Sequence, residues 1–178
     1  MSGRVVKWVP PCRLVPFEAA WAELVASWAQ DAREAYWLAP RNAPPLTAAE
    51  VLRWHTPGHT PYALLEEGRA TPVGYGELNR LSSGRRRYWL GHLVIDPAER
   101  GRGLGAALTR KLLEEAFVRR RAQEVSLVVF PDNVAAIACY RAAGMREDGY
   151  ETHEFAAYRR VETLLRMVVR AGPRGQWP

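Results

Sequence analysis

The sequence is poor in several residue types, and each shortage excludes a class of protein. Its 178 residues include two cysteines, Cys12 and Cys139, which lie too far apart in the chain to suggest a disulfide framework or a cysteine metal site. It has no run of about 18 apolar residues, which excludes a membrane-spanning helix. Residues 1–11 lack the apolar core of a secretory signal. We therefore expect a cytoplasmic protein without a membrane partner.

Lysine is also scarce, so arginine carries nearly all of the formal net charge of +6. Only Lys7 and Lys111 are lysines. A basic chain favours nucleic acid or an anionic small ligand. The arginine triplets at 85–87 and 119–121 are not interleaved with aromatic residues, as a nucleic-acid groove would be, and they indicate a hairpin tip and a helix end. We expect no nucleic-acid partner and no metal.

The length and the overall composition are typical of one globular domain. A chain of this length, 48% apolar and 25% charged, can bury a substantial core. It contains no internal repeat and no linker between domains. The sequence therefore predicts one domain over residues 1–178, with a frayed tail at 171–178.

Apolar periodicity and turn residues predict the order of the elements. Helices are expected over 18–28, 47–54, 103–121 and 133–144, and a loop over 56–61. Thr47 and Glu50 have the spacing of a capping box at the start of the second helix. Strands are expected over 12–17, 62–66, 73–81, 87–95, 125–130, 146–155 and 163–170.

This order predicts an α/β fold with a single mixed sheet. The short turns before and after strand 73–81 indicate an antiparallel meander, and Gly91 within strand 87–95 indicates a bulge. The helix at 103–121 connects two strands that should be parallel through a right-handed crossover. We expect a mostly antiparallel sheet with a central parallel pair and helices on both faces.

The clearest indication of a binding site lies in residues 91–105, GHLVIDPAERGRGLG. A strand and a loop precede a helix whose first turn carries almost no side chains. Such a turn exposes backbone N–H groups at the positive end of a helix dipole and can bind phosphate. Gly101-x-Gly103-x-x-Ala106 also matches a dinucleotide fingerprint, but residues 97–100 separate it from the strand. The third possibility is that the glycine-rich segment is only a flexible loop. A P-loop is excluded because the segment lacks Gly-Lys-Ser/Thr.

Two motifs carry a resemblance to a known family. Arg100-x-x-Gly103-x-Gly105 resembles the Arg/Gln-x-x-Gly-x-Gly/Ala signature of the GCN5-related N-acetyltransferases (GNAT). Asn133, followed by Tyr140 seven residues later and then by Gly144-Met145, resembles the family's later motif, in which the last residue is phenylalanine. The order of elements over 12–170 fits as well.

The resemblance implies acetyl-CoA as co-substrate and a sheet whose central parallel strands splay apart. The backbone after Arg100 would hold the pyrophosphate, and strand 93–95 would pair with the pantetheine arm. Arg100 and Arg102 would add positive charge, although each could equally be a solvated surface residue. The cofactor-binding residues so implied are Leu93, Val94, Ile95, Arg100, Gly101, Arg102, Gly103, Leu104, Gly105, Ala106, Asn133 and Tyr140.

Three residues are candidates for the chemistry. By resemblance, Tyr140 is the general acid that protonates the departing thiolate; the alternative is a core tyrosine with a bonded hydroxyl. The candidate bases are His92, because histidine is the residue type that ordinarily changes charge near neutral pH, and Glu77, which would need a pKa raised by burial. Either could instead be structural. Cys139 is expected to be a packing residue because neighbours on a helix point apart.

The resemblance predicts an enzyme that transfers acetyl directly to a primary amine. A non-catalytic acyl-CoA-binding module on the same fold is the alternative. The sequence leaves open whether the acceptor is a small amine, an antibiotic, a protein N-terminus or a lysine, and whether the protein is a homodimer. Six residues could line the acceptor pocket or belong to the core: Trp28, Tyr36, Trp37, Trp54, His55 and Tyr62.

Overall fold

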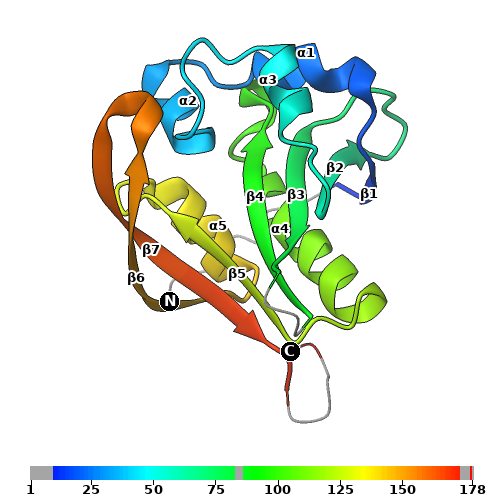
Figure 1. The fold of residues 1–178 in the computed structure, drawn as a ribbon. Coiled ribbons are helices and arrows are strands. Elements are labelled where there is room, and N and C mark those ends of the chain that lie inside the picture. Colours follow the sequence, from blue (N-terminus) through cyan, green and yellow to red (C-terminus); the bar gives the residue numbers. More distant parts are fainter. Residues whose placement is uncertain (1–9, 83–85, 173–176, 178) are drawn as a thin grey trace, which may run out of the picture.

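Seven strands form one sheet in the order β1-β2-β3-β4-β5-β7-β6 (Figure 1). The structure is a computed structural model that describes residues 10–82, 86–172 and 177. The strands are β1 (Cys12–Pro16), β2 (His59–Glu66), β3 (Gly74–Arg80), β4 (Arg87–Ile95), β5 (Glu124–Val129), β6 (Arg146–Phe155) and β7 (Arg160–Arg170). All neighbouring pairs are antiparallel except β4 and β5. The predicted mixed sheet with one parallel pair is confirmed.

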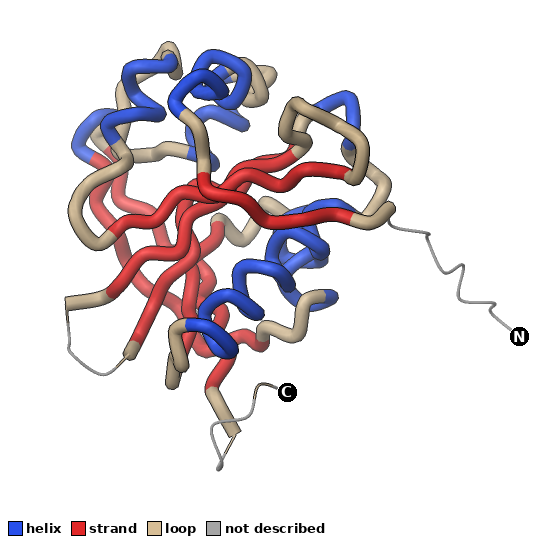
Figure 2. Tube along the Cα trace, turned by 90° about the vertical axis from the view of Figure 1, so that its right-hand side faces the viewer, coloured by secondary structure: helices blue, strands red, loops and turns tan. Residues whose placement is uncertain are grey.

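The helices cover both faces of this sheet (Figure 2), as predicted. The α-helices are α1 (Ala22–Ala26), α2 (Ala32–Leu38), α3 (Ala48–Arg53), α4 (Leu104–Glu114) and α5 (Val134–Ala142). The 3-10 turns are η1 (Ala19–Trp21), η2 (Pro97–Glu99) and η4 (Ala156–Tyr158), and the π-helical turn η3 (Glu115–Arg119) continues α4. The core between α4 and the sheet includes Leu108, Leu112 and Val125, whereas α1 and α3 pack on the opposite face around Tyr75.

The two central strands separate soon after they pair. β4 pairs with β5 only from Arg87 opposite Glu124 to Trp89 opposite Ser126. Beyond these residues the strands diverge, which is visible in Figure 1 as a widening gap between their ribbons. The splay implied by the resemblance is confirmed, and it leaves the second half of β4 without a strand partner on that side.

A bulge interrupts β4 beside Gly91, as predicted. Tyr75 of β3 lies opposite Val94 and Glu77 lies opposite Gly91, so that β4 holds one residue more than β3 between these pairs. His92, within the extra segment, has a φ of 49°. Gly91 itself has no room for a side chain, because a Cβ there would lie 2.7 Å from the Trp89 ring. The bulge increases the local twist and redirects the His92 side chain.

Several predicted boundaries were wrong near the N-terminus. The helix expected over 18–28 is only the short η1 and α1, and α2 was not predicted at all. Asp31 caps α2 by accepting from the N–H of Glu34. The predicted loop at 56–61 is partly strand, since β2 begins at His59. Pro61 is tolerated there because β1 has ended and Pro61 only accepts a bond, from the N–H of Phe17.

The other elements agree with the prediction to within a few residues. Thr47 caps α3 by accepting from the N–H of Glu50. The triplet 119–121 lies at the end of η3, where Arg119 and Arg120 both pair with Glu115. The hairpin tip expected at residue 85 and most of the tail expected at 171–178 lie outside the described residues. Trp177, which is described, stacks on Phe117.

Candidate active site

The splay between β4 and β5 opens into a cavity of about 1380 Å³. Its walls include Leu90–Ile95 of β4 on one side and Leu127–Phe130, at the end of β5, on the other. The predicted strand residues Leu93, Val94 and Ile95 therefore all line it. The carbonyl of Ile95 already accepts a bond from Nε of Arg100, at 3.2 Å.

The glycine-rich loop and the start of α4 form one end of this cavity. Gly103 is the N-cap of α4, and its φ of 84° is a left-handed conformation that suits glycine. No side chain caps this helix, and Gly101, Gly103, Leu104 and Gly105 all line the cavity. Backbone groups at a helix start with a positive dipole are thus placed against an open space. Ala106, in contrast, does not line the cavity, and its N–H donates to Sγ of Cys139.

The two loop arginines both bind to the protein itself. Arg100 lines the cavity and donates to both carboxylate oxygens of Glu34, at 2.6 and 3.1 Å, and to the carbonyl of Trp28. The first of these contacts holds the pKa of Glu34 below its ordinary value. Arg102 does not line the cavity and pairs with Glu66 and Glu99. Arg100 therefore ties the loop to α2, and the positive charge of both side chains is already balanced.

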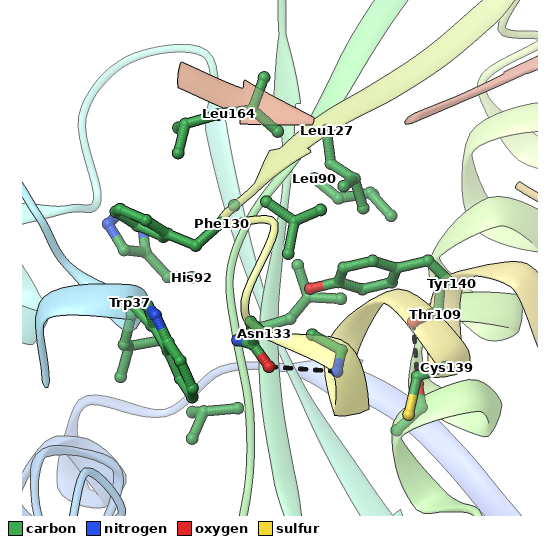
Figure 3. A pocket seen from close by; sticks show the side chains of 18 of the residues that line it. Trp37, Leu90, His92, Thr109, Leu127, Phe130, Asn133, Cys139, Tyr140 and Leu164 are labelled. Carbon is green, nitrogen blue, oxygen red and sulfur yellow. Dashed lines mark hydrogen bonds between the residues drawn. The ribbon is translucent and has the colours of Figure 1, made fainter. Parts of the chain in front are cut away.

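Helix α5 presents Asn133 and Tyr140 to the same cavity, as their spacing implied. Asn133 caps the helix by accepting from the N–H of Ala136 at 3.2 Å. Figure 3 shows the Tyr140 hydroxyl pointing into the pocket, across from His92 and Trp37. Within the described residues it has no hydrogen-bond partner, unlike the bonded hydroxyl of a core tyrosine. Burial raises the pKa of Tyr140, so the hydroxyl keeps its proton near neutral pH.

His92 and Glu77, the two candidate bases, are in direct contact. Nδ1 of His92 lies 3.0 Å from Oε1 of Glu77, whose side chain is fully buried, whereas His92 lines the cavity. The imidazole is stacked on the Trp54 ring, with centroids 3.9 Å apart and planes 3° apart. Trp54 is in turn fixed by a bond from its Nε1–H to Asn42. No local pattern indicated this stack, because Trp54 and His92 are distant in the chain.

Glu77 is the centre of a buried polar network. The Tyr75 hydroxyl donates to Oε1 at 2.7 Å, and the Asn79 amide donates to Oε2 at 2.9 Å. Burial raises the pKa of Glu77, but bonds from His92, Asn79 and Tyr75 outweigh it and hold that pKa below its ordinary value. Burial and the adjacent carboxylate raise the pKa of Tyr75, so that it remains a donor. Glu77 is therefore an ionised acceptor, without the raised pKa that a carboxylate base requires.

This ionisation fixes the tautomer of His92. A carboxylate can only accept, so Nδ1 of His92 must carry the proton that it shares with Glu77. The other ring nitrogen, Nε2, then holds a lone pair in the neutral imidazole. A buried carboxylate that orients a histidine in this way is the same arrangement by which serine-protease triads prepare their general base.

The aromatic residues considered for an acceptor pocket divide between cavity and core. Trp28 and Trp37 line the cavity, whereas Tyr36, Trp54, His55 and Tyr62 do not. Sequence reasoning missed six other ring-bearing residues that do line it: His59, Trp89, Phe130, Tyr150, His153 and Phe155. Most of these are in strands, where an alternating pattern shows which residues share a face but not which face meets a cavity.

Two further sequence expectations concern metal and membrane. Residues 10–82, 86–172 and 177 contain no group of three histidine, cysteine or acidic side chains placed to hold a metal ion. In the same part of the chain, none of the helices combines the length and the apolar character needed to cross a bilayer.

Comparison with known proteins identifies the family. Residues 4–145 match the acetyltransferase (GNAT) family. A curated relative, the N-alpha-acetyltransferase RimI of Mycobacterium tuberculosis, is 39% identical over 94 residues, which cover 51% of this chain and 55% of that protein. The chain thus matches about half the length of this relative.

Solved structures agree in fold. Spermidine N-acetyltransferase from Vibrio cholerae, in complex with CoA and spermine, superposes with a TM-score of 0.73 at 18% identity, covering 89% of this chain and 95% of that one. An aminoglycoside acetyltransferase in complex with coenzyme A and kanamycin gives 0.68 at 21% identity, covering 93% and 96%. At these identities the likeness establishes the fold alone. Because the family match spans most of the sequence, the chain belongs to the acetyltransferase (GNAT) family, as its two motifs implied.

Proposed function

We propose that this protein transfers the acetyl group of acetyl-CoA directly to a primary amine. The observation that carries the proposal is the position of His92 and Tyr140, which face each other across one cavity. One side chain can accept a proton there and the other can donate one. Family membership supports the donor, and the CoA complexes of the neighbours are consistent with it.

The cavity has the features that acetyl-CoA would need. The backbone N–H groups of Leu104 and Gly105 would bind the pyrophosphate at the start of α4. The pantetheine arm would follow Leu93 and Val94 along the free edge of β4. Gly105 allows the start of α4 to pack closely on α5, because a Cβ there would lie 2.8 Å from Sγ of Cys139. We assign Arg100 to holding the loop in place, and Asn133 to both the helix cap and the cofactor.

His92 is the proposed base. An amine acceptor is protonated at neutral pH, with a pKa of about 10 for a lysine-like amine, and it must lose a proton to attack. Nε2 of His92 takes that proton, directly or through one water. Glu77 stabilises the imidazolium that results, and Trp54 adds a face on which the cation stacks. Both act through His92 and do not themselves touch the acceptor.

The reaction then proceeds in two steps. The neutral amine forms a C–N bond to the thioester carbon, giving a tetrahedral intermediate whose negative charge lies on the former carbonyl oxygen. Collapse breaks the C–S bond, the positively charged nitrogen loses its second proton to solvent, and Tyr140 donates its proton to the departing thiolate. Solvent returns a proton to Tyr140 and removes one from His92, so that each turnover of the protonated amine yields one N-acetyl amine, one free CoA and one proton.

Two assays test this proposal together. A thermal shift measures binding of acetyl-CoA, with NAD as the matched dinucleotide control, and a thiol assay measures CoA release with a panel of amines. Stabilisation by acetyl-CoA with amine-dependent thiol release supports the enzyme. Stabilisation without thiol release favours the non-catalytic acyl-CoA-binding module, and stabilisation by NAD alone refutes the donor. A cytoplasmic location and the choice between monomer and homodimer remain predictions.

A further inference from the structure

The carboxylates that face the cavity are already neutralised by arginine. In the described part of the chain, only Glu34 and Glu151 among the acidic residues line the cavity. Glu34 is held by two guanidinium nitrogens of Arg100, and Glu151 by Nε of Arg166 at 3.1 Å. A second ammonium group on an acceptor would therefore find no unpaired negative charge among these residues.

The acidic residues behind Glu151 are paired in the same way. Glu124 accepts from Arg87 at 2.6 Å, from Arg166 at 3.0 Å and from Arg170 at 2.8 Å. Asp148 pairs with Arg166 and Arg170. Burial raises the pKa of Glu124, but the bonds from Arg87 and Arg170 outweigh it and keep that pKa low, so that the carboxylate remains ionised. Three carboxylates and three arginines thus form a balanced network between β4, β5, β6 and β7.

The unpaired charge in the cavity is positive. Arg41 lines the cavity, and no carboxylate of the described residues lies within 4.0 Å of its guanidinium. Its guanidinium lies over the Phe155 ring at 5.7 Å from the centroid. A like charge nearby disfavours a second cation on the acceptor.

Much of the remaining wall is aromatic. Trp37, Phe130 and His92 lie together on one side of the pocket in Figure 3. Trp89 and Phe155 line the cavity as well, and Tyr150 lines it with 66% of its surface exposed. Such a wall binds an apolar or aromatic group well and gains little from a polar polyamine chain.

We infer that the acceptor carries one ammonium group next to an apolar or aromatic group, and that polycations are poor acceptors. This rests on the proposed function, because it assigns the acceptor of the same site. It separates the chain from the two solved neighbours described above, which were captured with spermine and with kanamycin. A free arylalkylamine and the N-terminal residue of a peptide can both combine one ammonium group with an adjacent apolar or aromatic group.

The test compares matched acceptors in the CoA-bound protein. 2-Phenylethylamine, spermine, kanamycin, a peptide with N-terminal phenylalanine and the same peptide N-blocked with an internal lysine are each assayed for kcat/KM. Each is also assayed for binding by calorimetry. We expect 2-phenylethylamine or the phenylalanine peptide to exceed both polycations by about tenfold or more. Whichever of these two acceptors has the higher kcat/KM shows whether the amine comes from a small molecule or from a peptide N-terminus.

A charge reversal makes the test specific to the cavity. Arg41→Glu places a carboxylate at the wall and should raise the affinity for spermine relative to 2-phenylethylamine by about tenfold. Arg13→Glu is the matched control, because Arg13 is exposed on β1 and does not line the cavity. Because Arg41 lines the cavity that also holds the donor in the proposed function, the acetyl-CoA affinity of both variants is measured first and the amine assays are run at saturating acetyl-CoA.

The outcomes separate this inference from the proposed function. Preferential binding of the monoamine without any acetylation supports the inference and refutes the proposed reaction. Acetylation or binding that favours spermine or kanamycin overturns the inference. Equal responses of Arg41→Glu and Arg13→Glu overturn it as well, and so does a failure of every amine to bind.

Discussion

Nδ1 of His92 lies 3.0 Å from Oε1 of Glu77, although one residue faces the cavity and the other is fully buried. The bulge in β4 makes this contact possible. Gly91 is the residue paired with Glu77, and the bulge that follows it turns the next side chain, His92, toward the carboxylate. A backbone irregularity in β4 thus connects a buried charge to an imidazole that lines the cavity.

Replacement of His92 by alanine should lower kcat/KM at neutral pH by about 10² to 10⁴. The amine would then lose its proton only to solvent, so the loss should shrink as the pH rises toward the pKa of the amine. Measured pH–rate profiles of wild type and variant check this. A variant that retains the wild-type rate and profile would show that His92 is not the base. Glutamine at position 92, which keeps the size but not the basicity, is the matched control.

Replacement of Glu77 by glutamine should lower both the catalytic activity and the stability of the fold. The amide can no longer accept from Tyr75 and His92 as an ion does, and the loss of these buried bonds should cost about 1–3 kcal/mol. Because the folded state lowers the pKa of Glu77, its stabilisation is present above the ordinary value of 4.5 and is lost as the pH falls through the lower folded value.

Urea unfolding of the two proteins at several pH values checks the effect of Glu77→Gln. The difference in free energy of unfolding should be largest near neutral pH and should shrink in acid. A difference that is constant with pH would contradict an ionised Glu77. Glu67→Gln is a matched control, because Glu67 is exposed and outside the network.

Replacement of Tyr140 by phenylalanine should lower kcat by about 10² or more, with little change in the KM for acetyl-CoA. Its hydroxyl has no hydrogen-bond partner within the described residues, so thermal stability should also change little. Tyr36→Phe is the control, because that hydroxyl donates to Glu162 and does not line the cavity. A fully active Tyr140→Phe protein would mean that the thiolate leaves without this acid.

Replacement of Gly105 by alanine should destabilise the start of α4 by about 1–3 kcal/mol. The new methyl group would lie 2.8 Å from Sγ of Cys139, and the helix start would have to move. The double variant Gly105→Ala with Cys139→Ala removes that sulfur and should regain much of the loss. Thermal denaturation with and without acetyl-CoA measures both effects, and equal stability of the single and double variants would refute the proposed clash.

Local patterns were enough to predict the order of most elements along the chain, the antiparallel meander and the parallel pair. The glycine-rich loop, the bulge beside Gly91 and the cap at Thr47 depend on neighbouring residues, and each was predicted. Helix α2 was missed because it is short and its stability comes from packing of Tyr36 on Phe130 and Phe155, which are distant in sequence.

Side-chain partners could not be predicted from the sequence for the same reason. The pattern suggested Arg102 for the phosphates, but its charge is balanced by Glu66 and Glu99. It also offered His92 and Glu77 as alternatives, whereas the structure joins them and adds Trp54. Spacing in the chain identifies residues that share an element, but only the tertiary fold brings together residues from β3, β4 and the end of α3.

The central claim is direct acetyl transfer to an amine with His92 as base. The most direct measurement is mass-spectrometric quantification of N-acetyl amine and free CoA formed from acetyl-CoA by wild type and by His92→Ala. We predict one N-acetyl product per CoA released, no acetyl group on the protein, and a rate that falls by about 10² or more in the variant. Bound acetyl-CoA that yields no N-acetyl product, or equal rates for the two proteins, would contradict the claim.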